Sequence, residues 1–269
     1  MLRFGLLRLA CAAILLAALP APTFALPRST TDRPDDQAGS QIHFLYVVPS
    51  DGVDRALDTK GKIGTSVAAF ARWLEKQSGG FSLRLDRFQG DLDVTFYRLS
   101  RTDAEIASHG DFVRDEIQRD LNAAGFNQSG KLYAIYYDGR SPTRCGGGSW
   151  PPDLPGNVVA LYLHGEPPGA PPCISNPLAS SRFSPGYLEF SMIHEIFHGL
   201  GAAARCAPHH TREGHVSDDP RDLMYAGDQP WQPSLLDINR DDYFSRPPAH
   251  LPAGCLDLRD SPFLIPPSR

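Results

Sequence analysis

Residues 191–227, SMIHEIFHGLGAAARCAPHHTREGHVSDDPRDLMYAG, hold five of the nine histidines of the chain and decide how the rest of it is interpreted. Residues 194–198 read HEIFH, an HExxH pattern. Positions four apart lie on one face of an α-helix, so the two imidazoles can point at one metal ion. Glu195 can then reach a water on that metal and take its proton. Apolar residues around the pattern predict a buried helix over Tyr187–Leu200.

The glycines after this helix extend the pattern. Gly201 permits a left-handed turn that brings the chain back toward the metal. With His194, Glu195, His198 and Gly201 in place, the stretch resembles the metzincin clan of zinc metallopeptidases, whose motif is HExxHxxGxxH. The third histidine of that motif would stand at position 204, where this chain has Ala204.

The pattern resumes later in the chain. Residues 215–225, HVSDDPRDLMY, resemble the segment that runs from the third zinc histidine to the Met-turn in matrix metalloproteinases. This alignment places an eleven-residue insertion, Ala204–Gly214, before the third ligand. His215 is then predicted as that ligand and Met224 as the Met-turn residue. The alternatives for the third ligand are the loop histidines His209 and His210, or an aspartate.

The resemblance implies a Zn²⁺ site made by His194, His198 and His215, with Glu195 as the catalytic residue and water in the fourth position. It also implies an α+β fold: a twisted mixed sheet, two long helices, the active-site helix, and an irregular, loop-rich C-terminal part. By order, the strand at Val158–Leu163 corresponds to the antiparallel edge strand that binds an extended peptide substrate.

Hydrophobic periodicity predicts the elements around this site. We expect strands over Ile42–Val48, Leu132–Tyr137 (a central strand) and Val158–Leu163, and one or two strands over Phe81–Phe88 and Asp91–Leu99. We expect helices over Thr65–Gln77, Asp103–Ala124 and Tyr187–Leu200, and a short one around Ser234–Asp241. The Gly- and Pro-rich stretch Ser141–Gly156 is predicted to be a loop.

The first 25 of the 269 residues have the features of a secretory signal peptide. Arg3 and Arg8 supply positive charge, an apolar run covers Leu9–Leu19, and cleavage is expected after Ala25. Residues 26–40 are polar and are predicted to be a disordered lead, so residues 41–269 form the single zinc peptidase domain. The net charge of −5 argues against nucleic-acid binding, and no second apolar stretch predicts a membrane span in the mature form. We expect a monomer.

Five cysteines become four once Cys11 leaves with the signal peptide. An even number of cysteines in an oxidising compartment favours two disulfides. Of the three possible pairings, we favour Cys145–Cys173 with Cys206–Cys255, because each bond would close one irregular loop region.

The sequence therefore predicts a secreted zinc-dependent endopeptidase acting on extended peptide or protein substrates. Two other functions remain open: a zinc hydrolase of a non-protein amide of the cell-wall type, and a catalytically inactive secreted binding module stabilised by its metal. The intact Glu195 argues against the inactive module, because a structural zinc site has no use for that carboxylate.

Overall fold

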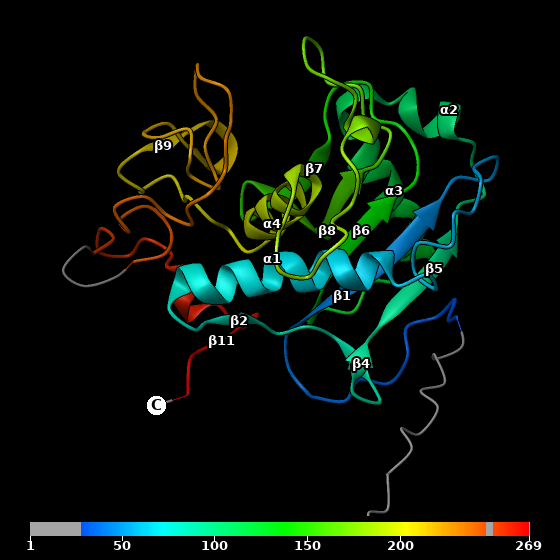
Figure 1. Cartoon of the computed structure of the whole chain (residues 1–269), viewed down its shortest axis with the longest axis horizontal. Coiled ribbons are helices and arrows are strands. Elements are labelled where there is room, and N and C mark those ends of the chain that lie inside the picture. The colour runs from blue at the N-terminus through cyan, green and yellow to red at the C-terminus, as the bar shows by residue number, and fades with distance from the viewer. Residues whose placement is uncertain (1–27, 246–249, 269) are drawn as a thin grey trace, which may run out of the picture.

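The computed structural model describes residues 28–245 and 250–268 (Figure 1). The predicted signal peptide, residues 1–25, lies outside the described residues. At the centre is a mixed sheet of five strands in the order β5-β1-β6-β8-β7. These strands are β1 (Gln41–Val48), β5 (Val94–Arg98), β6 (Lys131–Tyr137), β7 (Gly146–Trp150) and β8 (Leu154–Tyr162). The α+β prediction is confirmed, and β6 is the central strand as expected.

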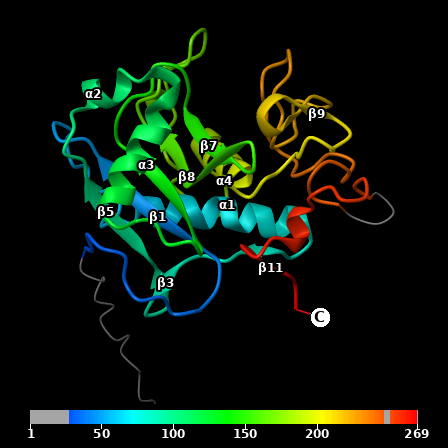
Figure 2. The same ribbon diagram turned by 180° about the vertical axis from the view of Figure 1, so that it is seen from behind.

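Helices cover both faces of the sheet because its strands alternate in side-chain direction. On one face, side chains such as Phe44 and Tyr46 of β1 pack beneath α1 (Lys62–Ser78) and α4 (Tyr187–Gly199). On the other face, Leu45 and Val47 pack beneath α2 (Asp103–Ala107) and α3 (Val113–Ala123). Figures 1 and 2 show these two layers from opposite sides. The site helix α4 is therefore held on a sheet whose inner strands β1 and β6 are buried throughout.

The remaining elements are short. Three two-stranded ribbons pair β2 (Ser82–Leu83) with β11 (Leu264–Ile265), β3 (Arg87–Phe88) with β4 (Asp91–Leu92), and β9 (His210–Thr211) with β10 (His215–Val216). Four 3₁₀ turns lie at Gly110–Phe112, Cys173–Ser175, Arg212–Gly214 and Leu258–Asp260. Within the described ranges, no helix combines the length and apolarity needed to cross a membrane.

The single helix predicted over Asp103–Ala124 is wrong. It is divided into α2 (Asp103–Ala107) and α3 (Val113–Ala123). A capping box at Thr102 starts α2, and Gly110 between the two helices has a φ of 58°. That left-handed conformation interrupts a right-handed helix and suits glycine. The apolar positions nevertheless face the sheet, which is why periodicity alone suggested one helix.

Two loop predictions also need correction. Ser141–Gly156 contains β7, whose run of glycines has low β-propensity and so hides a strand. Ser234–Asp241 forms no helix. There the carboxylate of Asp237 accepts hydrogen bonds from the main-chain nitrogens of Tyr243 and Phe244. Side-chain acceptors of this kind compete with helical hydrogen bonds and favour irregular backbone.

The polar lead is bound to the sheet and is not disordered over its described part, residues 28–40. Ser29 bridges Thr95 of β5. The ammonium of Lys131, buried at the start of β6, lies 2.7 Å from Asp32 and 2.5 Å from Asp35. The prediction counted the polar composition of the lead but not the buried lysine that complements it.

Past α4 the chain forms a loop-rich lobe, seen to one side of the sheet in Figure 1. The buried carboxylate of Asp222 organises it: Oδ1 accepts from the Met224 nitrogen at 2.7 Å and the Tyr243 hydroxyl at 2.8 Å, and Oδ2 accepts from the Ile238 nitrogen at 2.8 Å. Both predicted disulfides are present, Cys206–Cys255 within this lobe and Cys145–Cys173 beside β7.

Asp138, which follows β6, is the buried partner of an ion pair with several hydrogen bonds. Its carboxylate accepts hydrogen bonds from the Tyr46 hydroxyl at 2.6 Å and from two guanidinium nitrogens of Arg55, and it lies 2.8 Å from His164 Nε2. Burial favours the neutral acid, but the hydrogen bonds from His164, Arg55 and Tyr46 outweigh it and lower the pKa of Asp138 to about 2.

We predict that Asp138→Asn lowers the free energy of unfolding by about 2 kcal/mol at pH 7, because the ionised form is stabilised only in the folded state. The pKa of Asp138 lies below its ordinary value of 3.8, so this stabilisation is complete above that pH and is lost as the pH falls toward 2. Urea unfolding at a series of pH values measures it. The exposed Asp91→Asn is the control, and a difference from wild type that is unchanged at pH 2 would contradict the prediction.

Candidate metal centre and cleft

Helix α4 is anchored at its start by a buried carboxylate. Glu189 Oε1 accepts hydrogen bonds from the Ser66 hydroxyl of α1 at 2.6 Å and from the Ala179 nitrogen at 3.0 Å. Its other oxygen accepts from the Gly186 nitrogen at 2.9 Å, which caps the first turn. This fixes the axis of the helix that carries residues 194–198.

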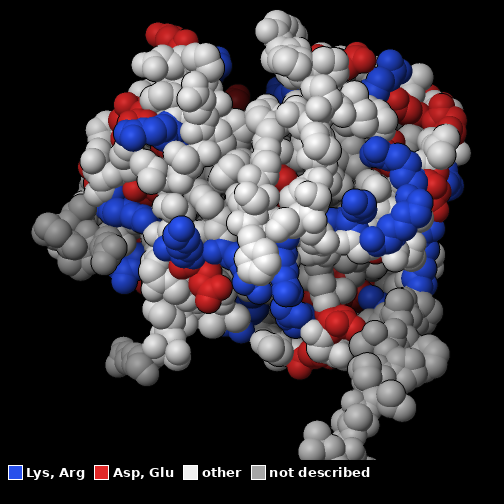
Figure 3. All heavy atoms as spheres, viewed as in Figure 1, with Lys and Arg blue, Asp and Glu red and all other residues white. Residues whose placement is uncertain are grey.

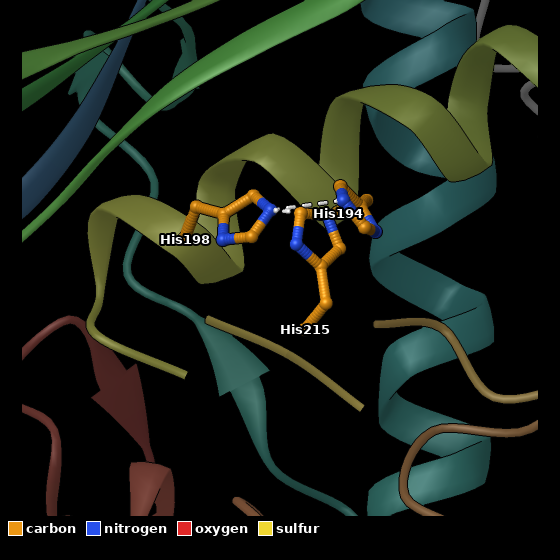
Figure 4. Close-up of side chains that lie close together, drawn as sticks. All are labelled: His194, His198 and His215. Carbon is orange, nitrogen blue, oxygen red and sulfur yellow. Dashed lines mark hydrogen bonds between the residues drawn. The ribbon is translucent and has the colours of Figure 1, made fainter. Parts of the chain in front are cut away.

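Three imidazoles converge on one point (Figure 4). His194 and His198 extend from successive turns of α4, and His215 extends from β10 toward them. The Nε2 atoms of His194 and His198 are 2.9 Å apart, and those of His198 and His215 are 3.2 Å apart. The structure thus brings together the three residues that the sequence predicted as zinc ligands.

The hydrogen bonds made by the Nδ1 atoms of His194 and His215 show that their Nε2 atoms face the centre with a lone pair. His194 Nδ1 donates to the Leu223 carbonyl at 2.6 Å, and His215 Nδ1 donates to the Arg212 carbonyl at 3.0 Å. In a neutral ring the other nitrogen then carries a lone pair. One proton on His198 Nε2 cannot satisfy both of these acceptors, whereas a cation between the rings satisfies all three nitrogens.

The three rings are held neutral. Burial and, to a smaller extent, the neighbouring His215 lower the pKa of His194 to about 3. Burial likewise lowers the pKa values of His198 and His215 below the ordinary value. Neutral imidazole is the form that ligates metal, so the site is prepared for a cation at neutral pH.

The donor set fits zinc. Zinc prefers imidazole nitrogens at 2.0–2.1 Å in a tetrahedral arrangement, which puts two ligand nitrogens about 3.3 Å apart. The observed separations are close to that spacing. Backbone carbonyl partners behind His194 and His215 supply the outer hydrogen bonds that usually orient such ligands. His198 Nδ1 is buried without a partner in the described part of the chain.

The rival histidines lie elsewhere. His209 Nδ1 is 3.0 Å from the buried Asp242 carboxylate, and its main-chain nitrogen donates to the same residue. His210 stacks on Trp150 with 5.5 Å between ring centres, and its Nδ1 donates to the Ala203 carbonyl. Both rings therefore hold the inserted loop in place and do not join the three-histidine centre.

Three further groups of His and Asp side chains lie close together, around His43, His209 and Asp237. The first is an ion-pair network, since Asp86 contacts both His43 and the Lys131 ammonium at 2.7 Å. The other two groups share the Asp242 carboxylate, which already pairs with the His209 ring. Within residues 28–245 and 250–268, only the centre at His194 combines three neutral imidazoles.

Glu195 lies directly against strand β7. A side-chain carbon built on Gly146 would come within 2.3 Å of Glu195 Oε1, and one built on Gly148 within 3.0 Å of Oε2. The carboxylate therefore packs on bare backbone. Burial raises the pKa of Glu195 to about 8, against the opposing charges of Arg144 and Arg114. A carboxyl that binds a proton this readily is suited to general acid–base work.

Strand β7 is one of the two edge strands of the sheet, opposite β5, and it alone runs antiparallel. The sequence analysis gave this position to Val158–Leu163, which belongs instead to β8, a strand paired on both sides. Both faces of β7 are filled, because Gly146 and Gly148 meet α4 and Gly147 meets the Tyr162 hydroxyl. Only the outer backbone edge is open, and it pairs with no strand of the described ranges.

The segment after β10 ties the lobe to the centre. Val216, next to His215, donates to the Met224 carbonyl at 3.0 Å, and Leu223 accepts from His194. Met224 is fully buried, as expected of an apolar residue beneath the site. Tyr225 is also buried, and its hydroxyl accepts from the Gln229 nitrogen at 3.1 Å.

A cleft of about 800 Å³ contains the three histidines and Glu195. It runs along β7, and in Figure 3 the surface is hollowed at the top between the lobe and the loops beside β7. Its walls carry four aromatic side chains, Trp150, Tyr187, Tyr225 and Trp231, and three arginines, Arg144, Arg205 and Arg212. These wall residues and β7 were not predicted from the sequence. The three consecutive glycines two residues before Trp150 could have indicated a strand that packs closely against another element.

Comparison with known proteins does not assign a family. No family model matches the chain, and no curated protein matches it. Among solved structures, two crystal forms of wild-type OgpA from Akkermansia muciniphila are similar, with TM-scores of 0.41 and 0.37 and identities of 16% and 17%. They cover 80% and 66% of this chain, which spans 60% and 50% of their length.

A third similar structure is catalytically inactive OgpA in complex with an O-glycopeptide substrate, glycodrosocin. Its TM-score is 0.33 at 13% identity, and it covers 67% of this chain and 50% of its own. Likeness at this level supports no functional assignment, so the resemblance to the metzincins stays a proposal that depends on the site itself.

We predict that His215→Ala loses bound zinc, because two imidazoles cannot replace three, while His210→Ala keeps a full equivalent. His209→Ala should at most reduce zinc content partly, through disturbance of the loop. Atomic spectroscopy after dialysis against metal-free buffer measures the content. Loss of zinc from His209→Ala with retention in His215→Ala would show that the third ligand lies inside the loop.

Proposed function

We propose that residues 41–269 form a zinc-dependent endopeptidase of metzincin-like type, secreted after removal of residues 1–25. The observation that carries the proposal is the convergence of three neutral imidazoles beside a buried glutamate, at the open edge of a β-strand. Each part has a use in amide hydrolysis, and a purely structural zinc site needs neither the glutamate nor the edge. The two disulfides suit an oxidising compartment.

His194, His198 and His215 would hold the zinc ion, and Glu195 would be the catalytic residue. When bound, zinc polarises the scissile carbonyl and lowers the pKa of water. Glu195 accepts a proton from the attacking water and delivers it to the leaving amine nitrogen. Its carboxylate is buried against Gly146 and lines the same cleft as the three histidines.

An extended peptide would bind by adding a strand to the free edge of β7. Unpaired N–H and C=O groups of an edge strand bind a peptide backbone independently of its side chains. Because β7 adjoins Glu195, a peptide bound there passes beside the three histidines. The absence of side chains on Gly146, Gly147 and Gly148 favours backbone recognition over side-chain recognition at this strand.

The second candidate is a zinc hydrolase of a non-protein amide, such as a cell-wall peptide. It uses the same centre, since substrate choice lies in the cleft walls. Incubation of the zinc-loaded protein with casein and with isolated peptidoglycan separates the two, and we expect cleavage of casein. Release of amines from peptidoglycan alone would favour the alternative. If the protein is an inactive binding module, it will cleave neither casein nor peptidoglycan.

We predict that Glu195→Gln keeps zinc and the fold but lowers kcat by several orders of magnitude, because the amide cannot accept the proton. Zinc content, circular dichroism and kcat on casein-derived peptides test it together. Turnover near the wild-type rate in a zinc-loaded variant would exclude Glu195 as the base.

We predict that Gly146→Ala lowers kcat about a hundredfold while zinc stays bound, because the added methyl displaces the Glu195 carboxylate. Gly64→Ala is the matched control. It adds the same methyl in α1, where no atom lies within 4 Å, and should leave kcat unchanged. Equal kcat values for the two variants would refute the role of the bare strand.

A further inference from the structure

We infer that the cleft selects substrates that carry an anionic group near the scissile bond, and that Arg144 and Arg212 recognise this group. The inference rests on the proposed endopeptidase function. The group recognised is a carboxylate or phosphate on the substrate, bound by guanidinium groups of the cleft that is lined by the three histidines.

The first argument comes from what β7 lacks. Gly146, Gly147 and Gly148 have no side chains, and both faces of the strand are filled, so the strand itself cannot distinguish one substrate side chain from another. Selection must come from residues that flank the edge. Among the charged residues that line the cleft outside the centre, three are arginines, Arg144, Arg205 and Arg212, and two are acids, Asp153 and Glu213.

The arginines come from two unconnected segments. Arg144 stands two residues before the glycine run, next to the Cys145–Cys173 disulfide. Arg212 belongs to the insertion, Ala204–Gly214, three residues before His215. Both line the cleft. The same cleft is lined by the three histidines and Glu195, so both guanidiniums share one cavity with the centre.

Their partners leave them able to bind an anion. Asp111 accepts from Arg144 Nη2 at 2.6 Å, and the side chain remains 45% exposed. Arg212 is exposed and forms no ion pair with any carboxylate of the described residues. Arg205 differs because two of its guanidinium nitrogens donate hydrogen bonds to the Asp153 carboxylate. We therefore assign it no role in recognition. The acidic residues Glu213 and Asp153 also line the cleft, so an anion is attracted only in the immediate surroundings of Arg144 and Arg212.

The net charge of the whole chain excludes one alternative source of a preference for anionic substrates. With a net charge of −5, the protein as a whole repels anions. Preference for an acidic substrate therefore cannot arise from the overall field, and it requires guanidiniums placed at the cleft. Arginine is suited to this task because its planar fork binds carboxylate and phosphate through paired hydrogen bonds.

The test uses zinc-loaded full mature protein and one cleaved peptide found by library digest. Matched versions of this peptide carry Glu or Gln at each position around the cut, and a second pair carries phosphoserine or serine. We expect kcat/KM for the anionic member to exceed that of its neutral match about fivefold at one position, the size of an exposed ion pair. The arm that shows the preference identifies the group as carboxylate or phosphate.

The double variant Arg144→Gln/Arg212→Gln should bring this ratio to about 1, whereas a general structural defect would lower both rates and leave the ratio intact. Arg119→Gln is the control, because Arg119 is 68% exposed on α3 with one carboxylate partner and lies outside the cleft. Equal rates in the wild type, or a preference kept by the double variant, would overturn the inference alone. No cleavage of any peptide would overturn the endopeptidase proposal and this inference with it.

Discussion

The contact between the Glu195 carboxylate and the bare backbone of β7 constrains the rest of the site. Helix α4 can approach the sheet this closely only where the strand has no side chains. The approach excludes water from the glutamate, and burial then raises its pKa. It also places the open edge of the sheet beside the imidazoles, so one close packing arrangement supplies the base, its environment and a surface for an extended chain.

The third imidazole depends on a different kind of structure. His215 lies in a lobe with few regular hydrogen bonds, and its position is set by buried carboxylates and main-chain contacts. Asp222 fixes the turn at Met224, and Val216 bonds that turn to the strand that carries the histidine. The centre thus joins a rigid helix to a lobe held by side-chain acceptors, which is why a long insertion between the second and third ligands is tolerated.

Sequence reasoning predicted well where periodicity or residue order was strong. The helix at Tyr187–Leu200 followed from its apolar spacing, and His215 followed from the order of residues up to Tyr225, and the structure places it with the other two histidines. Strand β7 was missed because glycine has no periodic signature. The division at Gly110 was missed because both halves share one apolar face. The contacts of the polar lead depend on Lys131, a hundred residues away, which no local pattern reveals.

The glycine run also bears on how such a site can diverge. The three glycines of β7 offer selection almost nothing to vary, because an added side chain would disturb the Glu195 carboxylate or the Tyr162 hydroxyl. The inserted loop, tied down by Cys206–Cys255 and exposed at Arg205 and Arg212, is open to change in length and charge. Substitutions and insertions in this loop can therefore change the substrate preference while the residues of the hydrolytic centre stay the same.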